Sequence, residues 1–201
     1  MALYRRPRVV TEPVAVTLLV IDALERLGVA YAIGGSLAST VHGVVRATLD
    51  ADLVADLRRE QAAPLVQALG PAFYADEAAI REAVERRSSF NLIHLETMFK
   101  VDVFIPGGRA FDRQQLARRT MHVVATDPER TAYVTSAEDV ILAKLDWYRQ
   151  GGETSERQWR DVLGVFRTQA GQLDVTYLRQ WAEALKVGDL LARALAEAAK
   201  E

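Results

Sequence analysis

Asp50 and Asp52, in the stretch RATLDADLVADL at 46–57, are the residues whose types and spacing first suggest chemistry. The stretch alternates polar and apolar residues, which is typical of a strand, and side chains two residues apart in a strand share a face. Two neighbouring carboxylates repel each other and are costly to desolvate without a compensating cation. Either this face is a plain acidic surface or it binds something positive.

Two further stretches carry residues that suit the same chemistry. Gly34, Gly35 and Ser36 follow the strand-like residues YAI. A glycine turn into a helix favours phosphate binding through backbone amides, and a plain turn is the alternative. Asp102 stands in FKVDVFI with Lys100 two residues before it, so both share one face of a predicted strand. An ion pair between them on an exposed surface is the simpler interpretation.

Together, the glycine–serine turn and the three aspartates form a ligand set for a divalent metal on a nucleotide. Oxygen ligands suit Mg²⁺, which keeps several waters and takes other ligands from phosphates. Two such ions can activate an attacking hydroxyl and stabilise a leaving pyrophosphate. Metal neutralisation would then explain why Asp50 and Asp52 are tolerated side by side.

This three-part pattern resembles the signature of the DNA polymerase beta-like nucleotidyltransferase superfamily. The motif begins at Gly35 and Ser36, continues in DADL at 50–53 and ends in the VDV that surrounds Asp102. The stretch GGSLAS…VRATLDADL is most similar to the AbiEii-type toxin nucleotidyltransferases, in which an Arg-x-Thr commonly precedes the acids. Arg46 and Thr48 match that position.

The resemblance implies an α+β nucleotidyltransferase fold, in which a small mixed β-sheet is backed by helices and followed by a helical C-terminal part. It implies that Asp50, Asp52 and Asp102 are the catalytic residues and metal ligands, with two Mg²⁺ ions acting during catalysis. Asp102 would also help to deprotonate the acceptor hydroxyl. The implied nucleotide-binding residues are Gly34, Gly35, Ser36, Lys144 and Asp161.

Lys144 and Asp161 belong to the helical second half. Lys144 lies in the centre of an apolar stripe on a predicted helix at 136–149, where it either snorkels to the rim or points into a cleft. The segment SAEDVILAKLDWYR resembles the family helix whose lysine contacts the triphosphate. Asp161, in SERQWRDV, matches a later family aspartate by order. It lies opposite Trp159 and Leu163 on the helical wheel, a position that also fits exposure to solvent.

Hydrophobic periodicity predicts the elements that position these residues. A mixed α/β core at 1–135 precedes a helical subdomain at 136–201 that is expected to close the cleft. Residues 1–12 are expected to be irregular, and SFNLIHLE and FKVDVFI are expected to form a hairpin. The other expected strands lie at 31–33, 50–57, 121–125 and 132–135, and the expected helices at 14–27, 36–42, 59–69, 76–87, 109–119, 136–149, 155–169, 175–185 and 188–199.

Composition narrows the class of protein. The chain has 201 residues, a net charge of −2 and no cysteine. It therefore has no global basic field, which argues against extensive RNA contact. No apolar run approaches the ~20 residues that span a bilayer, and the cytoplasm is the expected compartment of a cysteine-free chain. The histidines are expected to be local structural or surface residues rather than catalysts: His42, His94 and His122.

The leading hypothesis is an Mg²⁺-dependent nucleotidyltransferase that moves a nucleoside monophosphate from an NTP to a hydroxyl of RNA, such as tRNA, or of protein. This hypothesis includes a role in a toxin–antitoxin pair, with a cognate antitoxin as the partner. No membrane partner is expected. One alternative is a nucleotidyltransferase that modifies a small antibiotic. The other is a non-catalytic member of the fold that binds a nucleotide or a partner protein, and the presence of all three acids counts against it.

Overall fold

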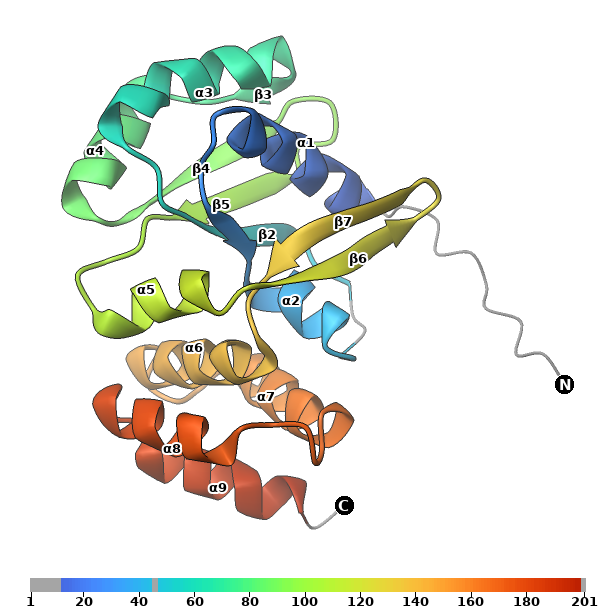
Figure 1. Ribbon diagram of the computed structural model, residues 1–201, viewed down its shortest axis with the longest axis vertical. Coiled ribbons are helices and arrows are strands. Elements are labelled where there is room, and N and C mark those ends of the chain that lie inside the picture. The colour runs from blue at the N-terminus through green and yellow to red at the C-terminus, as the bar shows by residue number, and fades with distance from the viewer. Residues whose placement is uncertain (1–11, 45–46, 200–201) are drawn as a thin grey trace, which may run out of the picture. The chain divides into compact units, whose positions relative to one another are not determined.

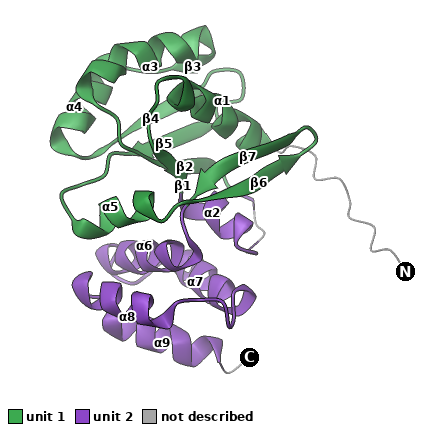
Figure 2. Cartoon of the chain, viewed as in Figure 1, with its two compact units in different colours: residues 1–33, 48–134 green, residues 34–47, 135–201 purple. Residues whose placement is uncertain are grey.

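The computed structural model of the chain describes residues 12–44 and 47–199. The chain divides into two compact units (Figure 2), the first made of residues 1–33 and 48–134 and the second of residues 34–47 and 135–201. The first unit holds all the described strands and the second is helical. In this division residues 34–47 group with the C-terminal helices, and the predicted parts at 1–135 and 136–201 stay a prediction.

The sheet of the first unit confirms the predicted mixed α+β architecture (Figure 1). Among the described residues, seven strands pair in the order β3-β4-β5-β2-β1-β7-β6. The pairs β2–β5 and β1–β7 are parallel and the other pairs are antiparallel. The strands are β1 (Tyr31–Ile33), β2 (Asp50–Ala55), β3 (Phe73–Tyr74), β4 (Ser89–His94), β5 (Lys100–Phe104), β6 (Thr120–Thr126) and β7 (Glu129–Val134).

Helices α1 (Glu12–Arg26), α3 (Ala62–Leu69) and α4 (Glu77–Arg86) lie on one side of this sheet (Figure 1). Alternation along β2 explains why, since its alternate residues Ala51, Leu53 and Ala55 are buried and form an apolar surface for the helices. Its remaining side chains, among them Asp50 and Asp52, point to the opposite side of the sheet. The first unit also contains α5 (Ala110–Ala117) and the short 3₁₀ helices η1 (Arg59–Gln61) and η2 (Gly70–Ala72).

The second unit consists of helices whose N-termini are mostly capped by side chains. The hydroxyls of Ser136 and Ser155 and the carboxylate of Asp174 each accept a hydrogen bond from a first-turn backbone amide, as good capping residues do. These caps explain why the helices begin where the sequence predicts. The helices are α2 (Gly35–Val41), α6 (Ala137–Gln150), α7 (Glu156–Thr168), α8 (Val175–Ala184) and α9 (Gly188–Ala198).

Each predicted helix and strand is present within a few residues of its expected bounds. The two-residue strand β3 was not predicted, because a segment that short has no alternation to detect. The expected irregular arm lies outside the described residues except for Glu12, which begins α1. Of the helices that the structure describes, none is both long enough and apolar enough to cross a membrane.

Candidate functional site

Three aspartates and one lysine share one face of two neighbouring strands in the first unit. β2 and β5 pair in parallel, with Asp50 opposite Lys100 and Asp52 opposite Asp102. Residues directly opposite in a sheet point to the same side, as do residues two apart along a strand. At the backbone, the four positions are ~4.8 Å apart between strands and ~6.6 Å apart along each strand. We call this array the acid face: Asp50, Asp52, Lys100 and Asp102.

Lys100 is the positive corner of the acid face. Its Nζ lies 2.7 Å from Oδ2 of Asp102, and the two side chains are 42% and 18% exposed. The hydrogen bond to Asp102 raises the pKa of Lys100, and the negative charges of Asp50 and Asp52 raise it further, against the lowering effect of burial. Lys100 is therefore charged at neutral pH. Its contact with Asp102 is the ion pair that the sequence analysis gave as the simpler interpretation.

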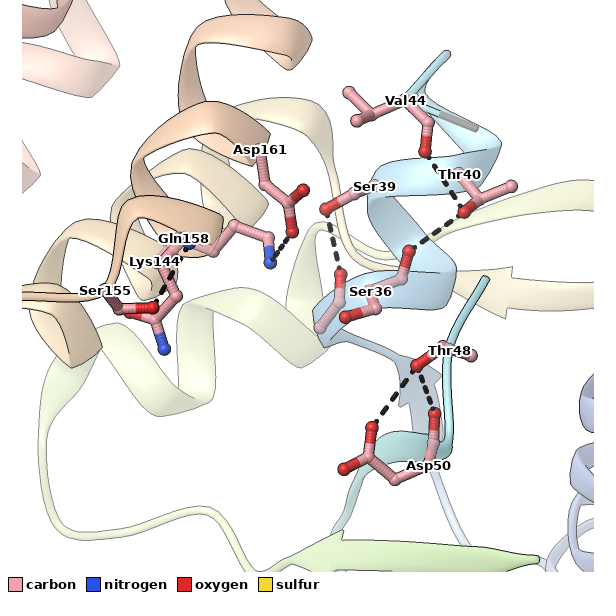
Figure 3. Close-up of polar contacts among 11 residues, drawn as sticks. Ser36, Ser39, Thr40, Val44, Thr48, Asp50, Lys144, Ser155, Gln158 and Asp161 are labelled. Carbon is pink, nitrogen blue, oxygen red and sulfur yellow. Dashed lines mark hydrogen bonds and ion pairs between the residues drawn. The ribbon is translucent and has the colours of Figure 1, made fainter. Parts of the chain in front are cut away.

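Two neutral side chains contact the acids. Asn91, which is opposite Asp102 on β4, donates a hydrogen bond from Nδ2 to Oδ1 of Asp102 at 3.3 Å. The Thr48 hydroxyl donates to the backbone carbonyl of Asp50 at 2.8 Å and lies 3.3 Å from Oδ1 of that residue (Figure 3). Both oxygens of Asp102 therefore have protein partners. Arg46, the other residue of the Arg-x-Thr pattern, lies outside the described residues.

The acid face has the donor chemistry that a hard divalent cation prefers. Its three carboxylates present oxygen ligands on one surface, and they already attract the ammonium group of Lys100. In the described part of the chain, however, no group of three His, Asp or Glu side chains is placed to hold a metal ion. Mg²⁺ binding at the acid face therefore stays a prediction.

The glycine–serine turn begins α2 in the second unit. Gly34 is the N-cap of this helix, and its carbonyl accepts the first helical hydrogen bond from the amide of Ala38 at 3.1 Å. Gly35 has a φ of +52°, a left-handed conformation that favours glycine. Ser36 is buried, and its carbonyl accepts a hydrogen bond from the Thr40 hydroxyl at 3.1 Å. The predicted turn into a helix is confirmed, whereas phosphate binding there stays a prediction.

Lys144 and Asp161 form a buried ion pair within the second unit. The ion pair joins Nζ of Lys144 to Oδ2 of Asp161 (Figure 3). The two atoms are 2.8 Å apart, and the side chains are only 9% and 3% exposed. Lys144 therefore does not snorkel to a rim. The position of Asp161 opposite Trp159 on the helical wheel also allowed exposure to solvent, and that interpretation is wrong. The physical reason is that α7 is enclosed on several sides, because it contacts α2, α6 and α9.

The comparisons with known proteins bear on the fold. No protein-family model and no curated protein matches this sequence. Among solved structures, the chain is similar to an antigenic nucleotidyltransferase-like protein from Paracoccidioides brasiliensis, with 18% identity, 90% of this chain and 91% of that chain covered, and a TM-score of 0.52. It is also similar to the antibiotic-resistance factor ANT(2'')-Ia, with 13% identity, 90% and 92% of the chains covered, and a TM-score of 0.53.

The chain has the nucleotidyltransferase fold. The predicted fold class is thus confirmed, while the more specific closeness to AbiEii-type toxins stays a prediction. Within this nucleotidyltransferase fold, the three predicted acids share one face of the sheet in the first unit. The predicted nucleotide-binding residues all belong to the second unit.

Sequence reasoning missed Asn91 and did not join Lys100 to the acids of β2. The hairpin register could have found Asn91, because a short connection around Glu96 and Thr97 sets it opposite Asp102. The position of Lys100 opposite Asp50 depends on the parallel pairing of β2 with β5. That pairing joins segments far apart in the chain, and no local pattern reveals it.

The three histidines have local contacts. His42 Nε2 donates to the carbonyl of Thr135 at 2.8 Å within the second unit. His94 and His122 each lie within hydrogen-bond distance of a threonine hydroxyl two or three residues away. These contacts fit the structural role expected of the histidines.

Proposed function

We propose that this chain is an Mg²⁺-dependent nucleotidyltransferase that transfers a nucleoside monophosphate from an NTP to a hydroxyl group and releases pyrophosphate. The observation that carries the proposal is the acid face. Asp52 and Asp102 are directly opposite on parallel strands there, and Asp50 lies beside them. The nucleotidyltransferase fold of the similar solved structures adds support.

In this proposal the three aspartates hold Mg²⁺, which when bound would stabilise the negative charge on the attacking and leaving oxygens. Asp102 takes the proton of the acceptor hydroxyl, and the acceptor oxygen forms a bond to the α-phosphorus of the NTP. The bond from the α-phosphorus to the oxygen that bridges to the β-phosphate breaks. Its electron pair leaves with pyrophosphate.

The residues proposed to bind the nucleotide rest on the family resemblance. Backbone amides at Gly34 and Gly35 and the Ser36 hydroxyl would contact the triphosphate, and Lys144 would neutralise it. Because Lys144 is hydrogen-bonded to Asp161, a phosphate contact requires the ammonium group to share or exchange this partner. Ammonium has three donors, so sharing needs no large movement.

The direct test is incubation with each labelled NTP, Mg²⁺, total RNA and cell lysate, with Asp52→Asn as the matched control. This substitution removes a metal ligand while nearly preserving shape. We expect label transfer by the wild-type chain and a loss of at least ~100-fold in the variant, on the scale of a strong electrostatic contribution to the transition state. The metal-free variant should be equally or more stable, because repulsion between Asp50 and Asp52 is relieved. Undiminished transfer by Asp52→Asn would remove the acid face from the mechanism.

RNA or protein is the proposed acceptor, and a small antibiotic is the second candidate. The similarity to an antibiotic-resistance factor favours this alternative. The net charge of −2 also favours an acceptor with few phosphates over a long RNA, since affinity for nucleic acids depends largely on neutralising phosphates. A panel of hydroxyl-bearing antibiotics in the same assay separates the two, because acid precipitates labelled macromolecules and leaves labelled antibiotics in solution.

A toxin role in a toxin–antitoxin pair extends the proposal, on the strength of the similarity to AbiEii-type toxins. Expression of the wild-type chain without an antitoxin should slow bacterial growth, and expression of Asp52→Asn should not. Equal growth inhibition by both chains would favour the non-catalytic alternative, in which the fold acts by binding a nucleotide or a partner protein.

A further inference from the structure

The acid face carries a cation of its own. Lys100 occupies one of its four positions, with its Nζ 2.7 Å from Oδ2 of Asp102 and with Asp50 opposite it on β2. Three negative charges and one positive charge therefore share a small surface. A divalent cation at the same carboxylates would meet the positive charge of Lys100 at close range, where like charges repel strongly.

We propose that Lys100 is a positioning residue that holds Asp102 in the metal-free protein and competes with a divalent cation for the acid face. This rests on the proposed function, because it assumes that the acid face binds metal. On this view, Lys100 occupies Oδ2 of Asp102 in the metal-free protein, and that oxygen becomes available to a metal ion when Lys100 leaves it.

The contacts of Asp102 support this role. Lys100 binds one carboxylate oxygen, Oδ2, and Asn91 donates to the other, Oδ1, at 3.3 Å. Of these two partners, only Lys100 is charged, so it is the one whose removal changes the electrostatic attraction for a metal. Its side chain is 42% exposed and has a long flexible stem. Lys100 can therefore swing into solvent without any movement of β5.

The backbone indicates that the ion pair is not needed to assemble the sheet. β5 pairs on both sides, with β2 and with β4, and its residues Val101 and Val103 are completely buried on the other face. The sheet should therefore keep its structure when Lys100 is replaced. That makes a metal-binding experiment on the intact chain informative.

The test titrates Mn²⁺, an oxygen-seeking ion that is visible by electron paramagnetic resonance, into the full chain without nucleotide. The variants are Lys100→Met, which keeps the stem and removes the charge, and Lys100→Arg, which keeps the charge. Arg81→Met is the matched control, because Arg81 forms a similarly exposed ion pair with Glu77 on α4. It changes the net charge equally but lies away from the acid face.

We expect Lys100→Met to bind Mn²⁺ about fivefold more tightly than the wild type, the upper range for losing one partly exposed ion pair. Lys100→Arg and Arg81→Met should stay within about twofold of the wild type on the same scale. Mn²⁺ should also raise the melting temperature of Lys100→Met more than that of the wild type, because binding to the native state stabilises it. If Lys100→Met does not fold, Lys100→Gln takes its place in both measurements.

The outcomes separate this proposal from the proposed function. Binding by the wild type with equal or weaker binding by Lys100→Met overturns the role of Lys100 and leaves the metal site standing. If Arg81→Met binds Mn²⁺ as much more tightly as Lys100→Met does, the role of Lys100 is also overturned, because the change in net charge would then explain the effect. Binding by none of the chains, or equal binding by Asp52→Asn, overturns the metal site and the role of Lys100 together.

Discussion

The two units each contain one lysine–aspartate pair of nearly the same length. Lys100 and Asp102 approach to 2.7 Å in the first unit, and Lys144 and Asp161 approach to 2.8 Å in the second. Their surroundings differ, because the first pair is partly exposed and the second is almost fully buried. Because the two distances are nearly equal, we expect burial to set the difference in what the two pairs contribute to stability. Removing one partner in the interior leaves an uncompensated charge, whereas solvent screens an exposed one.

The two pairs also differ in what they join. Lys100 and Asp102 are two residues apart on one strand, so their contact adds no link between elements. Lys144 and Asp161 join α6 to α7, which are separate helices of the second unit. The exposed pair is thus free to exchange partners, whereas the buried pair holds two helices together. Exchange suits a site for a metal, and a fixed charge suits a helix contact.

The largest expected difference is in stability. Lys144→Met should lower the free energy of unfolding by about 3–5 kcal/mol, because it leaves the buried Asp161 without its cation. Lys100→Met should change it by less than about 1 kcal/mol, because solvent screens the exposed pair. Urea denaturation of both variants measures the difference. Similar losses in the two variants would show that burial does not distinguish the pairs.

The second prediction separates the structural role of Lys144 from nucleotide binding. The double variant Lys144→Met with Asp161→Leu removes both charges, and it should recover to within about 1 kcal/mol of the wild type, since buried ion pairs are often replaceable by apolar residues. If Lys144 also contacts the triphosphate, this folded variant should lose about 1.5–3 kcal/mol of NTP binding free energy. Isothermal titration calorimetry measures the affinity. Unchanged affinity would leave Lys144 with a structural role alone.

Local sequence was enough to predict most of the fold. The alternation at 50–53 and 100–103 predicted both strands of the acid face and the side on which each acid lies. Apolar periodicity predicted helices at 136–149 and 175–185, and the structure has them at Ala137–Gln150 and Val175–Ala184. These features are encoded within a few neighbouring residues, so one sequence reveals them.

The environment of the charged residues could not be predicted in the same way. The helical wheel of α7 gave Asp161 a polar side, but the helix has neighbours on several sides and Asp161 is buried. The sequence offered an ion pair of Lys100 with Asp102 as the simpler interpretation, yet the place of Lys100 opposite Asp50 comes from the parallel pairing of β2 and β5. Both facts depend on contacts between segments distant in the chain, which a local pattern does not contain.

Salt provides a third and smaller way to distinguish the two pairs. In double-mutant cycles at low salt, the coupling energy of Lys100 and Asp102 should be ~0.5 kcal/mol, and it should approach zero at 1 M salt, where the screening length is only ~3 Å. The coupling of Lys144 and Asp161 should hardly change, because ions do not enter the interior. Each cycle uses Lys→Met and Asp→Asn variants. A salt-sensitive buried pair would show that solvent reaches Asp161.

Another ion pair, Arg149 with Asp189 in the second unit, extends the comparison to a more exposed carboxylate and to the smallest expected effect, since the Asp189 side chain is 69% exposed and that of Arg149 is 38% exposed. The hydrogen bond from Arg149 lowers the pKa of Asp189, and a backbone hydrogen bond from Leu190 lowers it further, against the raising effect of desolvation. A folded-state pKa below the unfolded one means that the pair stabilises the protein above the ordinary carboxyl pKa. This contribution is lost as the pH falls through the folded-state value.

The measurement for this pair is an NMR titration of the Asp189 carboxyl group in the wild type and in Arg149→Met. The wild-type pKa should lie below the ordinary value of ~3.9, and the variant should move back toward it. High salt should produce part of the same change in the wild type, because the pair is exposed to screening ions. An unchanged pKa in Arg149→Met would assign the shift to the backbone amide of Leu190. In that case, the contact with Arg149 would contribute little to the charged form of Asp189, although the two side chains form an ion pair.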